Sequence, residues 1–157
     1  MVFRKILVYL GLITLPHLSW ANDVHEYHLK NGLSLLVKED HRAPVVIAEI
    51  WYKVGSSYEP RGITGISHAL EHMMFRGTEK FAPGELEKKV AVNGGEQNAF
   101  TDSDFTAYYQ KFSADKLAIS FELEADRMRN LLLRSQDFAK EIQVVMEERR
   151  MRVDDNP

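Results

Sequence analysis

One stretch constrains the fold more than any other: Gly65–Phe75, which reads GISHALEHMMF. A polar loop that contains Gly and Pro precedes it, residues 55–64, and a break follows it at Arg76-Gly77-Thr78. These flanking residues predict a helix between them. Within that helix, His68 and His72 are four residues apart, so both imidazoles leave the same face.

The HxxEH pattern favours a metal centre on this helix. Two imidazole nitrogens, a carboxylate and an open position for water form a coordination sphere that zinc prefers in catalytic sites. Glu71 lies beside the histidine face, where it can reach a metal-bound water as a general base, and this order of residues is the inverzincin arrangement. The alternative is structural: the two histidines only cap the edge of a core, and Glu71 is an ordinary solvated helix residue.

A further protein ligand must come from elsewhere, and a helix predicted from Ser135 to about Val153 offers candidates. At about 100° per residue, Glu141 and Glu148 fall on one flank of its apolar stripe, and Glu147 points away. The stripe consists of Phe138, Ile142, Val145 and Met146. Glu141 and Glu148 are therefore both candidates, and the alternative is an acidic surface balanced by the arginines that follow.

Strand signals dominate the first half of the chain. Residues 25–30 and 33–38 flank Asn31-Gly32, a pair typical of a hairpin because both residues tolerate positive φ. A largely apolar third strand, expected at the centre of the sheet, follows at Val45–Val54. Two more strands are predicted at residues 96–101 and 105–112. A helix is predicted at residues 84–92, where Asn93-Gly94-Gly95 stops it. Two further helices are predicted, one at residues 113–133 capped by Ser113 and one at residues 135–153 capped by Ser135. Strands followed by helices predict an α+β fold, with helices packed on one face of a mixed or antiparallel sheet.

The amino end has the three parts of a secretory signal peptide. Arg4 and Lys5 give a basic start, residues 6–18 are mostly apolar, and Ser19-Trp20-Ala21 places small residues where a signal peptidase cuts. We expect cleavage after Ala21 and a periplasmic or secreted protein. A buried amino-terminal helix is the alternative. Since the chain has no Cys to carry a lipid, we expect no membrane anchor after cleavage.

Composition excludes several classes of protein. Of the 157 residues, 45% are hydrophobic and 27% are charged, with no Cys, which is typical of a folded domain and excludes a disordered chain or a disulfide scaffold. The 20 basic and 23 acidic residues give a net charge of −3 and form no basic block. Nucleic acid is therefore not an expected partner.

Three spaced motifs carry a family resemblance. His68-Ala69-Leu70-Glu71-His72 is followed 76 residues after His72 by Glu148, and Glu141 stands seven residues before Glu148. The third motif consists of Asn98-Ala99-Phe100-Thr101, Thr106 and Tyr108-Tyr109. Together they resemble the M16 zinc metallopeptidases, the family of pitrilysin, insulysin and the mitochondrial processing peptidases. The resemblance covers residues 26–157.

The resemblance implies a role for each site residue. In the family pattern, one zinc ion is bound by His68, His72 and Glu148, the general base is Glu71, and the residue that supports the ligand shell is Glu141. A peptide substrate is expected to add as a strand beside Asn98 and Ala99, so that backbone hydrogen bonds supply affinity with little sequence preference. The Asn98 amide is expected to bind the substrate backbone, and its alternative is a turn or strand-end residue.

The resemblance also implies a longer protein. Residues 22–157 correspond to the amino-terminal part of an M16 catalytic domain, LuxS/metallohydrolase-like in fold and incomplete at its carboxyl end. In the family, a second domain closes over the substrate and is expected to supply an Arg and a Tyr that help bind it. We therefore expect a zinc-dependent endopeptidase for peptides or unfolded segments, which hydrolyses them poorly without the missing domain or a partner subunit. The alternatives are an inactive truncated fragment and a non-catalytic M16 relative that acts as an assembly subunit.

Overall fold

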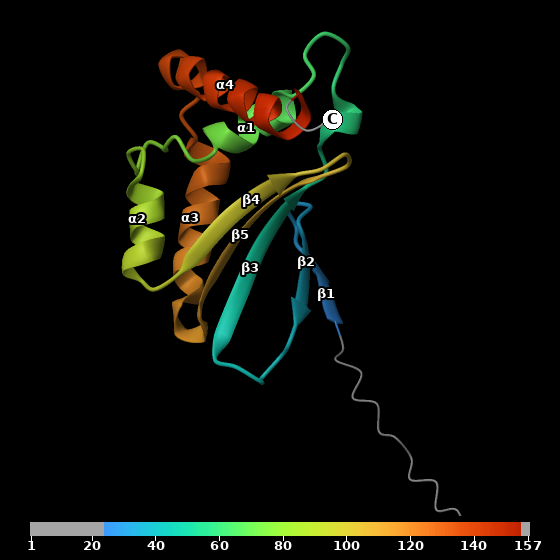
Figure 1. Ribbon diagram of the computed structural model, residues 1–157. Helices are drawn as coiled ribbons and strands as arrows, with labels where there is room; N and C mark the ends of the chain where they lie inside the picture. Colours follow the sequence, from blue (N-terminus) through green and yellow to red (C-terminus); the bar gives the residue numbers. More distant parts are fainter. Residues whose placement is uncertain (1–23, 155–157) are drawn as a thin grey trace, which may run out of the picture. The chain divides into compact units, whose positions relative to one another are not determined.

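The computed structural model describes residues 24–154, and the chain divides into two compact units between Ala43 and Pro44 (Figure 1). The expected signal peptide, residues 1–21, lies outside the described residues. None of the helices within the described range is long and apolar enough to cross a membrane.

The first unit contains a β-hairpin. Strand β1 (Val24–His28) pairs antiparallel with β2 (Ser34–Lys38), as the Asn31-Gly32 pair predicts. Of the two turn residues, only Gly32 has a positive φ, at 89°. Asn31 contributes instead through its side chain, which accepts a hydrogen bond from the Leu33 amide. The backbone bonds from the Leu29 amide to the Leu33 carbonyl and from the Gly32 amide to the Leu29 carbonyl close a three-residue turn that ends in left-handed Gly32, rather than the predicted two-residue turn.

The second unit is built on an antiparallel sheet. Its strands are β3 (Val45–Tyr52), β4 (Glu96–Thr101) and β5 (Thr106–Ser113), in the order β3-β5-β4. The expectation that β3 is central is therefore wrong, since β5 occupies the middle of this sheet. The burial pattern gives the reason: β3 alternates between half-buried and exposed side chains, whereas β5 buries three consecutive residues, Thr106 to Tyr108.

Within the described part of the chain, four α-helices accompany the sheet: α1 (Ile66–Met73), α2 (Glu85–Val92), α3 (Leu117–Asn130) and α4 (Ser135–Arg149). The core joins Leu86 and Val90 of α2, Leu123 of α3 and Phe112 of β5. Helices α2 and α3 thus cover one face of the sheet, while α1 and α4 lie against each other near one end of it (Figure 1). The architecture is the predicted α+β fold with an antiparallel sheet.

The predicted helix ends hold in one case and fail in two. Helix α2 stops where Gly94 takes a left-handed φ of 71°, as predicted. Ser113 does not cap α3, because a 3-10 turn over Ala114–Lys116 intervenes. Ser135 is the first residue of α4 rather than its cap, since Arg134 holds that position and its side chain bonds to Asp137.

A polar cluster lies buried between β5 and α3, and we call it the buried cluster: Gln110, Ser120, Glu124 and Arg127. The Arg127 guanidinium donates to Glu124 Oε1 at 2.5 Å, and Ser120 donates to Gln110 at the same distance. Arg127 also lies 5.1 Å from the ring centres of Phe75 and Tyr108. Its charge is therefore held by one carboxylate and two aromatic faces.

Candidate active site

Helix α1 begins with a cap supplied from six residues upstream. Glu59 accepts hydrogen bonds from the Gly65 amide at 2.6 Å and the Ser67 amide at 2.8 Å. Burial raises the pKa of the Glu59 carboxyl, but these amides outweigh it, so that its pKa falls below the usual value. Gly65 has no side chain that could cap the helix, and no local pattern in the sequence indicated that Glu59 does so.

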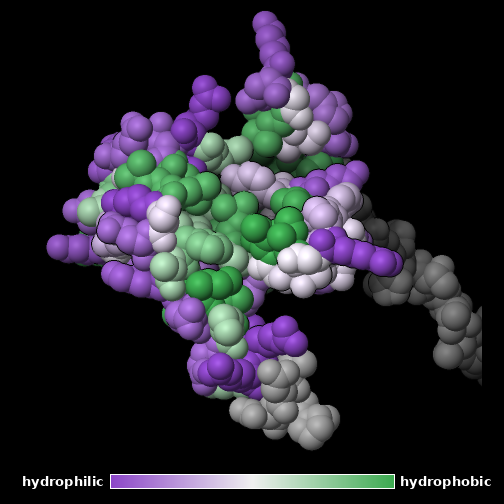
Figure 2. Space-filling view, turned by 90° about the horizontal axis from the view of Figure 1, so that it is seen from above, coloured by the Kyte–Doolittle hydropathy of each residue, from purple (hydrophilic) through white to green (hydrophobic). Residues whose placement is uncertain are grey.

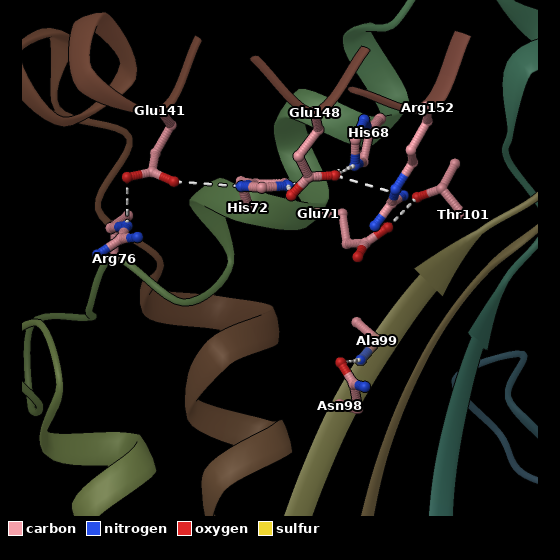
Figure 3. A network of polar contacts seen from close by, with 10 residues as sticks. All are labelled: His68, Glu71, His72, Arg76, Asn98, Ala99, Thr101, Glu141, Glu148 and Arg152. Carbon is pink, nitrogen blue, oxygen red and sulfur yellow. Dashed lines mark hydrogen bonds and ion pairs between the residues drawn. The ribbon is translucent and has the colours of Figure 1, made fainter. Parts of the chain in front are cut away.

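His68, His72 and Glu148 converge on one point between α1 and α4 (Figure 3). The two histidine Nε2 atoms are 3.2 Å apart. Each lies 3.6 Å from a different oxygen of the Glu148 carboxylate. The three side chains are half-buried, and we call them the open cluster.

The open cluster fits a zinc ion. Ligand atoms at about 2.0–2.1 Å from a tetrahedral zinc lie about 3.3 Å from one another, close to the observed separations of 3.2 and 3.6 Å. The His72 Nδ1 faces the Glu141 carboxylate at 3.2 Å, and the neutral tautomer that donates to Glu141 has its Nε2 lone pair available for a metal. That lone pair points at His68, an arrangement that a cation between the nitrogens would stabilise.

Glu141 has a different position from Glu148. It is 4% exposed, accepts from His72 Nδ1 at 3.2 Å and pairs with the Arg76 Nε at 2.8 Å (Figure 3). It therefore contacts the side of the imidazole that faces away from the open cluster. Glu147 is exposed and pairs with Arg150, which agrees with the helical-wheel expectation.

Glu71 is anchored to the sheet. Its Oε2 accepts a hydrogen bond of 2.5 Å from the Thr101 hydroxyl, at the end of β4 (Figure 3). The pKa of the Tyr108 hydroxyl is raised, first by burial of Tyr108 and next by the negative charge of Glu71. The sequence pattern did not reveal the Thr101 contact, because the two residues are 30 positions apart and nothing local relates them.

Strand β4 forms one edge of its sheet. The Asp102 amide donates to the Phe105 carbonyl at 2.9 Å, which makes this pair hydrogen-bonded. Hydrogen-bonded and open pairs alternate in an antiparallel ladder, so Ala99 and Thr101 turn their backbone groups away from β5. The Ala99 amide donates to the side chain of Asn98 at 2.9 Å. Asn98 therefore lies at the edge of the strand and covers an amide there.

The loop between β3 and α1 is hydrogen-bonded to the turn that follows the edge strand β4. The amides of Ser56 and Ser57 donate to the carbonyls of Asp102 and Ser103, at 3.1 and 2.8 Å. A Cβ atom on Gly55 would lie 2.2 Å from the Asp102 oxygen, so only glycine permits this approach. The loop that carries the Glu59 cap is thereby attached to the turn between β4 and β5.

These parts enclose a cleft of about 950 Å³. The open cluster and Glu71 line one side, and residues 98–103 line the other. Arg152 also lines it, and its guanidinium lies 3.4 Å from Glu148. The cleft therefore brings together all the predicted site residues except Glu141, which lies behind His72.

A second, more apolar hollow of about 570 Å³ lies between α1 and α4. It is lined by the predicted stripe of α4, of which Phe138 and Met146 are 42% and 45% exposed. The face seen from above in Figure 2 shows hydrophobic residues among hydrophilic ones. The stripe lies on one side of the helix as expected, but it is only partly covered.

Comparison with known proteins relates the chain to one family. The family model described as Insulinase (Peptidase family M16) matches residues 34–157. The zinc protease PqqE of Helicobacter pylori is 43% identical over 130 residues, which cover 82% of this chain and 29% of that protein. The crystal structure of a protease from Helicobacter pylori matches with a TM-score of 0.82 and 40% identity, over 87% of this chain and 33% of that one.

A relative of another kind matches as well. Subunit 1 of the mitochondrial cytochrome b-c1 complex of Bos taurus is 33% identical over 120 residues, which cover 76% of this chain and 25% of that protein. The chain thus spans between 25% and 33% of the length of these three proteins.

Proposed function

The chain belongs to the insulinase family, peptidase family M16, and on this basis we propose that it is the zinc-binding portion of a metalloendopeptidase that hydrolyses peptides or unfolded segments. The observation that carries the proposal is the convergence of His68, His72 and Glu148 beside Glu71 in one cleft. Two imidazoles, a carboxylate and an adjacent second carboxylate are the groups that metal-assisted hydrolysis requires.

The roles of the residues follow from their positions. His68, His72 and Glu148 hold one zinc ion, and Glu141 orients the His72 ring through Nδ1. When bound, zinc lowers the pKa of a water molecule towards neutrality and polarises the scissile carbonyl. Glu71 accepts the proton of the attacking water and then donates it to the leaving amine.

The substrate is a peptide in extended conformation, bound to the edge of β4. Ala99 and Thr101 offer outward backbone groups there, and these recognise any extended backbone regardless of its side chains. Asn98 covers the Ala99 amide and must turn aside for a substrate carbonyl to reach it. Its own side-chain amide is then free to bind the substrate backbone.

The complete activity depends on more polypeptide than residues 22–157. Since these residues span at most 33% of the compared proteins, the rest of the catalytic domain and a second domain or partner subunit are needed to close the cleft. We propose that the protein is exported, with its signal peptide cleaved after Ala21, and acts in the periplasm or outside the cell. The substrates would then be peptides in that compartment.

A comparison of wild type with Glu71→Gln tests the proposal. Both proteins are expected to bind one equivalent of zinc, but the variant loses about 10²- to 10⁴-fold in kcat, because only the proton acceptor is removed. Zinc is measured by atomic absorption and hydrolysis with an unstructured fluorogenic peptide. The assay is run on residues 22–157 alone and with the remaining polypeptide added.

Each outcome bears on one part of the proposal. Absence of zinc in both proteins contradicts the metal site, and equal hydrolysis by both contradicts the role of Glu71. Full activity of residues 22–157 alone contradicts the need for further polypeptide.

The second candidate is a non-catalytic assembly subunit, favoured by the 33% identity to the bovine cytochrome b-c1 subunit. It predicts no hydrolysis by zinc-loaded wild type even with the remaining polypeptide present. The presence of His68, Glu71, His72 and Glu148 together in this chain supports the peptidase over this candidate.

A further inference from the structure

We infer that Thr101 is a positioning residue for Glu71, and that the same residue orients the general base and pairs with the substrate backbone. The inference rests on the proposed function. The inference adds a residue of the edge strand β4 that sets the position of Glu71 relative to the peptide bond to be cleaved.

The Thr101 hydroxyl directs its one hydrogen at Glu71. It donates to Glu71 Oε2 at 2.5 Å, within the range of charge-assisted hydrogen bonds. The neighbouring hydroxyl of Thr106 lies 3.4 Å away and donates its hydrogen to the Val54 carbonyl at 2.9 Å. Thr106 is 3% exposed, so its hydroxyl is held in place within the sheet beside the Thr101 hydroxyl.

Anchoring one oxygen of Glu71 leaves the other available. Among residues 24–154, Glu71 Oε1 has no hydrogen-bond partner, and both Glu71 and the open cluster line the cleft (Figure 3). A glutamate side chain has several rotatable bonds, and holding it before the reaction removes an entropic cost from the chemical step. The Thr101 hydrogen bond therefore fixes the direction from which Glu71 meets a water molecule.

Thr101 is also part of the edge strand β4, to which the substrate is proposed to bind. Its backbone groups point away from β5, while its side chain stands roughly perpendicular to the sheet. One residue thus faces the peptide through its main chain and the base through its hydroxyl. The position of the bound backbone and the position of Glu71 are consequently set by the same rigid element.

Two substitutions at this position separate the hydroxyl from the shape of the side chain. Thr101→Val keeps the β-branch and removes the donor, and Thr101→Ser keeps the donor and removes the methyl group. In the zinc-loaded protein with its full polypeptide, we expect Thr101→Val to lower kcat about 10- to 100-fold. KM and zinc affinity should change by less than about threefold, because neither the backbone edge nor the zinc ligands are altered. Thr101→Ser should recover kcat to within about fivefold of wild type.

A structural readout makes the test independent of catalysis. In crystal structures of the zinc-loaded proteins, the Glu71 carboxylate is expected in one conformer in wild type and Thr101→Ser, and in several in Thr101→Val. The inference is overturned if Thr101→Val keeps wild-type kcat and a single Glu71 conformer, or if Thr101→Ser fails to recover either. If Glu71→Gln retains full activity, the proposed function fails, whereas the Glu71 conformers still decide the inference.

Discussion

The open cluster, carried by α1 and α4, and the buried cluster, carried by β5 and α3, are both built from charged and polar side chains, but they are assembled in opposite ways. In the buried cluster, Arg127 faces Glu124 at 2.5 Å, so that positive charge meets negative charge. In the open cluster, the Nε2 atoms of His68 and His72 and the Glu148 carboxylate lie 3.2 to 3.6 Å from one another, so that three groups able to bind a metal converge.

The difference separates a structural role from a ligand-binding role. Opposite charges in the interior offset each other without a ligand, and removing one of them is costly even though Glu124 Oε2 and the Nε and Nη1 atoms of Arg127 have no hydrogen-bond partner among the described residues. Converging acceptors are stable only when a cation or a proton lies between them. A cluster of acceptors beside a cleft is therefore a site, and a cluster of paired ions in the core is a support. A substitution in the buried cluster and one behind the open cluster test this distinction, and a third, at the cap of α1, is compared with them.

The largest effect is expected where the buried cluster is broken. Arg127→Met leaves Glu124 charged and unpaired in the interior and should lower the free energy of unfolding by about 3–5 kcal/mol. Urea denaturation measures this. Zinc stoichiometry of the folded fraction should stay at one, since Arg127 touches no zinc ligand.

The matched control is the double variant Glu124→Gln with Arg127→Met, which removes both charges and should regain much of the loss. A single variant as stable as wild type would show that the Arg127 pair does not support the fold. Loss of zinc from the folded single variant would show that the two clusters are not independent.

An intermediate effect is expected behind the open cluster. Glu141→Gln replaces the carboxylate that accepts from His72 and pairs with Arg76, and should weaken zinc affinity about 10- to 100-fold, because the ring is less firmly oriented and less basic. Competition with a fluorescent chelator measures the affinity. Glu147→Gln is the control on the same helix, exposed and directed away, and should bind zinc as wild type does. Equal affinity of the two variants would contradict the role of Glu141.

The smallest effect is expected at the cap of α1, and it depends on pH. The pKa of Glu59 is lowered in the folded state, so its contribution to stability is present above the unfolded pKa of about 4.3 and is lost as the pH falls through the folded pKa. Glu59→Gln should therefore cost roughly 1 kcal/mol at pH 7 and less below pH 4.

Thermal unfolding at both pH values checks the Glu59 prediction, with exposed Glu79→Gln as the control. If the difference in thermal stability between wild type and Glu59→Gln were larger at low pH than at pH 7, the assignment of Glu59 as a charged cap would be contradicted.

Local rules explain what could be predicted from the sequence. The hairpin around Gly32, the α1 helix and the end of α2 at Gly94 depend on a few adjacent residues and were predicted with small shifts. The serine caps failed because Ser113 and Ser135 satisfy the same local rule without using it. The central position of β5 could not be read from apolar content, since β3 is the more apolar strand of the two but only half-buries alternate residues.

The sequence by itself determined which groups share a helix face, because helical geometry depends only on spacing. His68 and His72 must leave α1 together, and Glu141 and Glu148 must lie on one flank of α4. Only the tertiary structure decided that Glu148 meets both histidines while Glu141 lies behind His72, that Glu59 caps α1 and that Thr101 holds Glu71. Those contacts join residues 6 to 80 positions apart, and their distances depend on how α4, α1 and β4 pack, which no local pattern encodes.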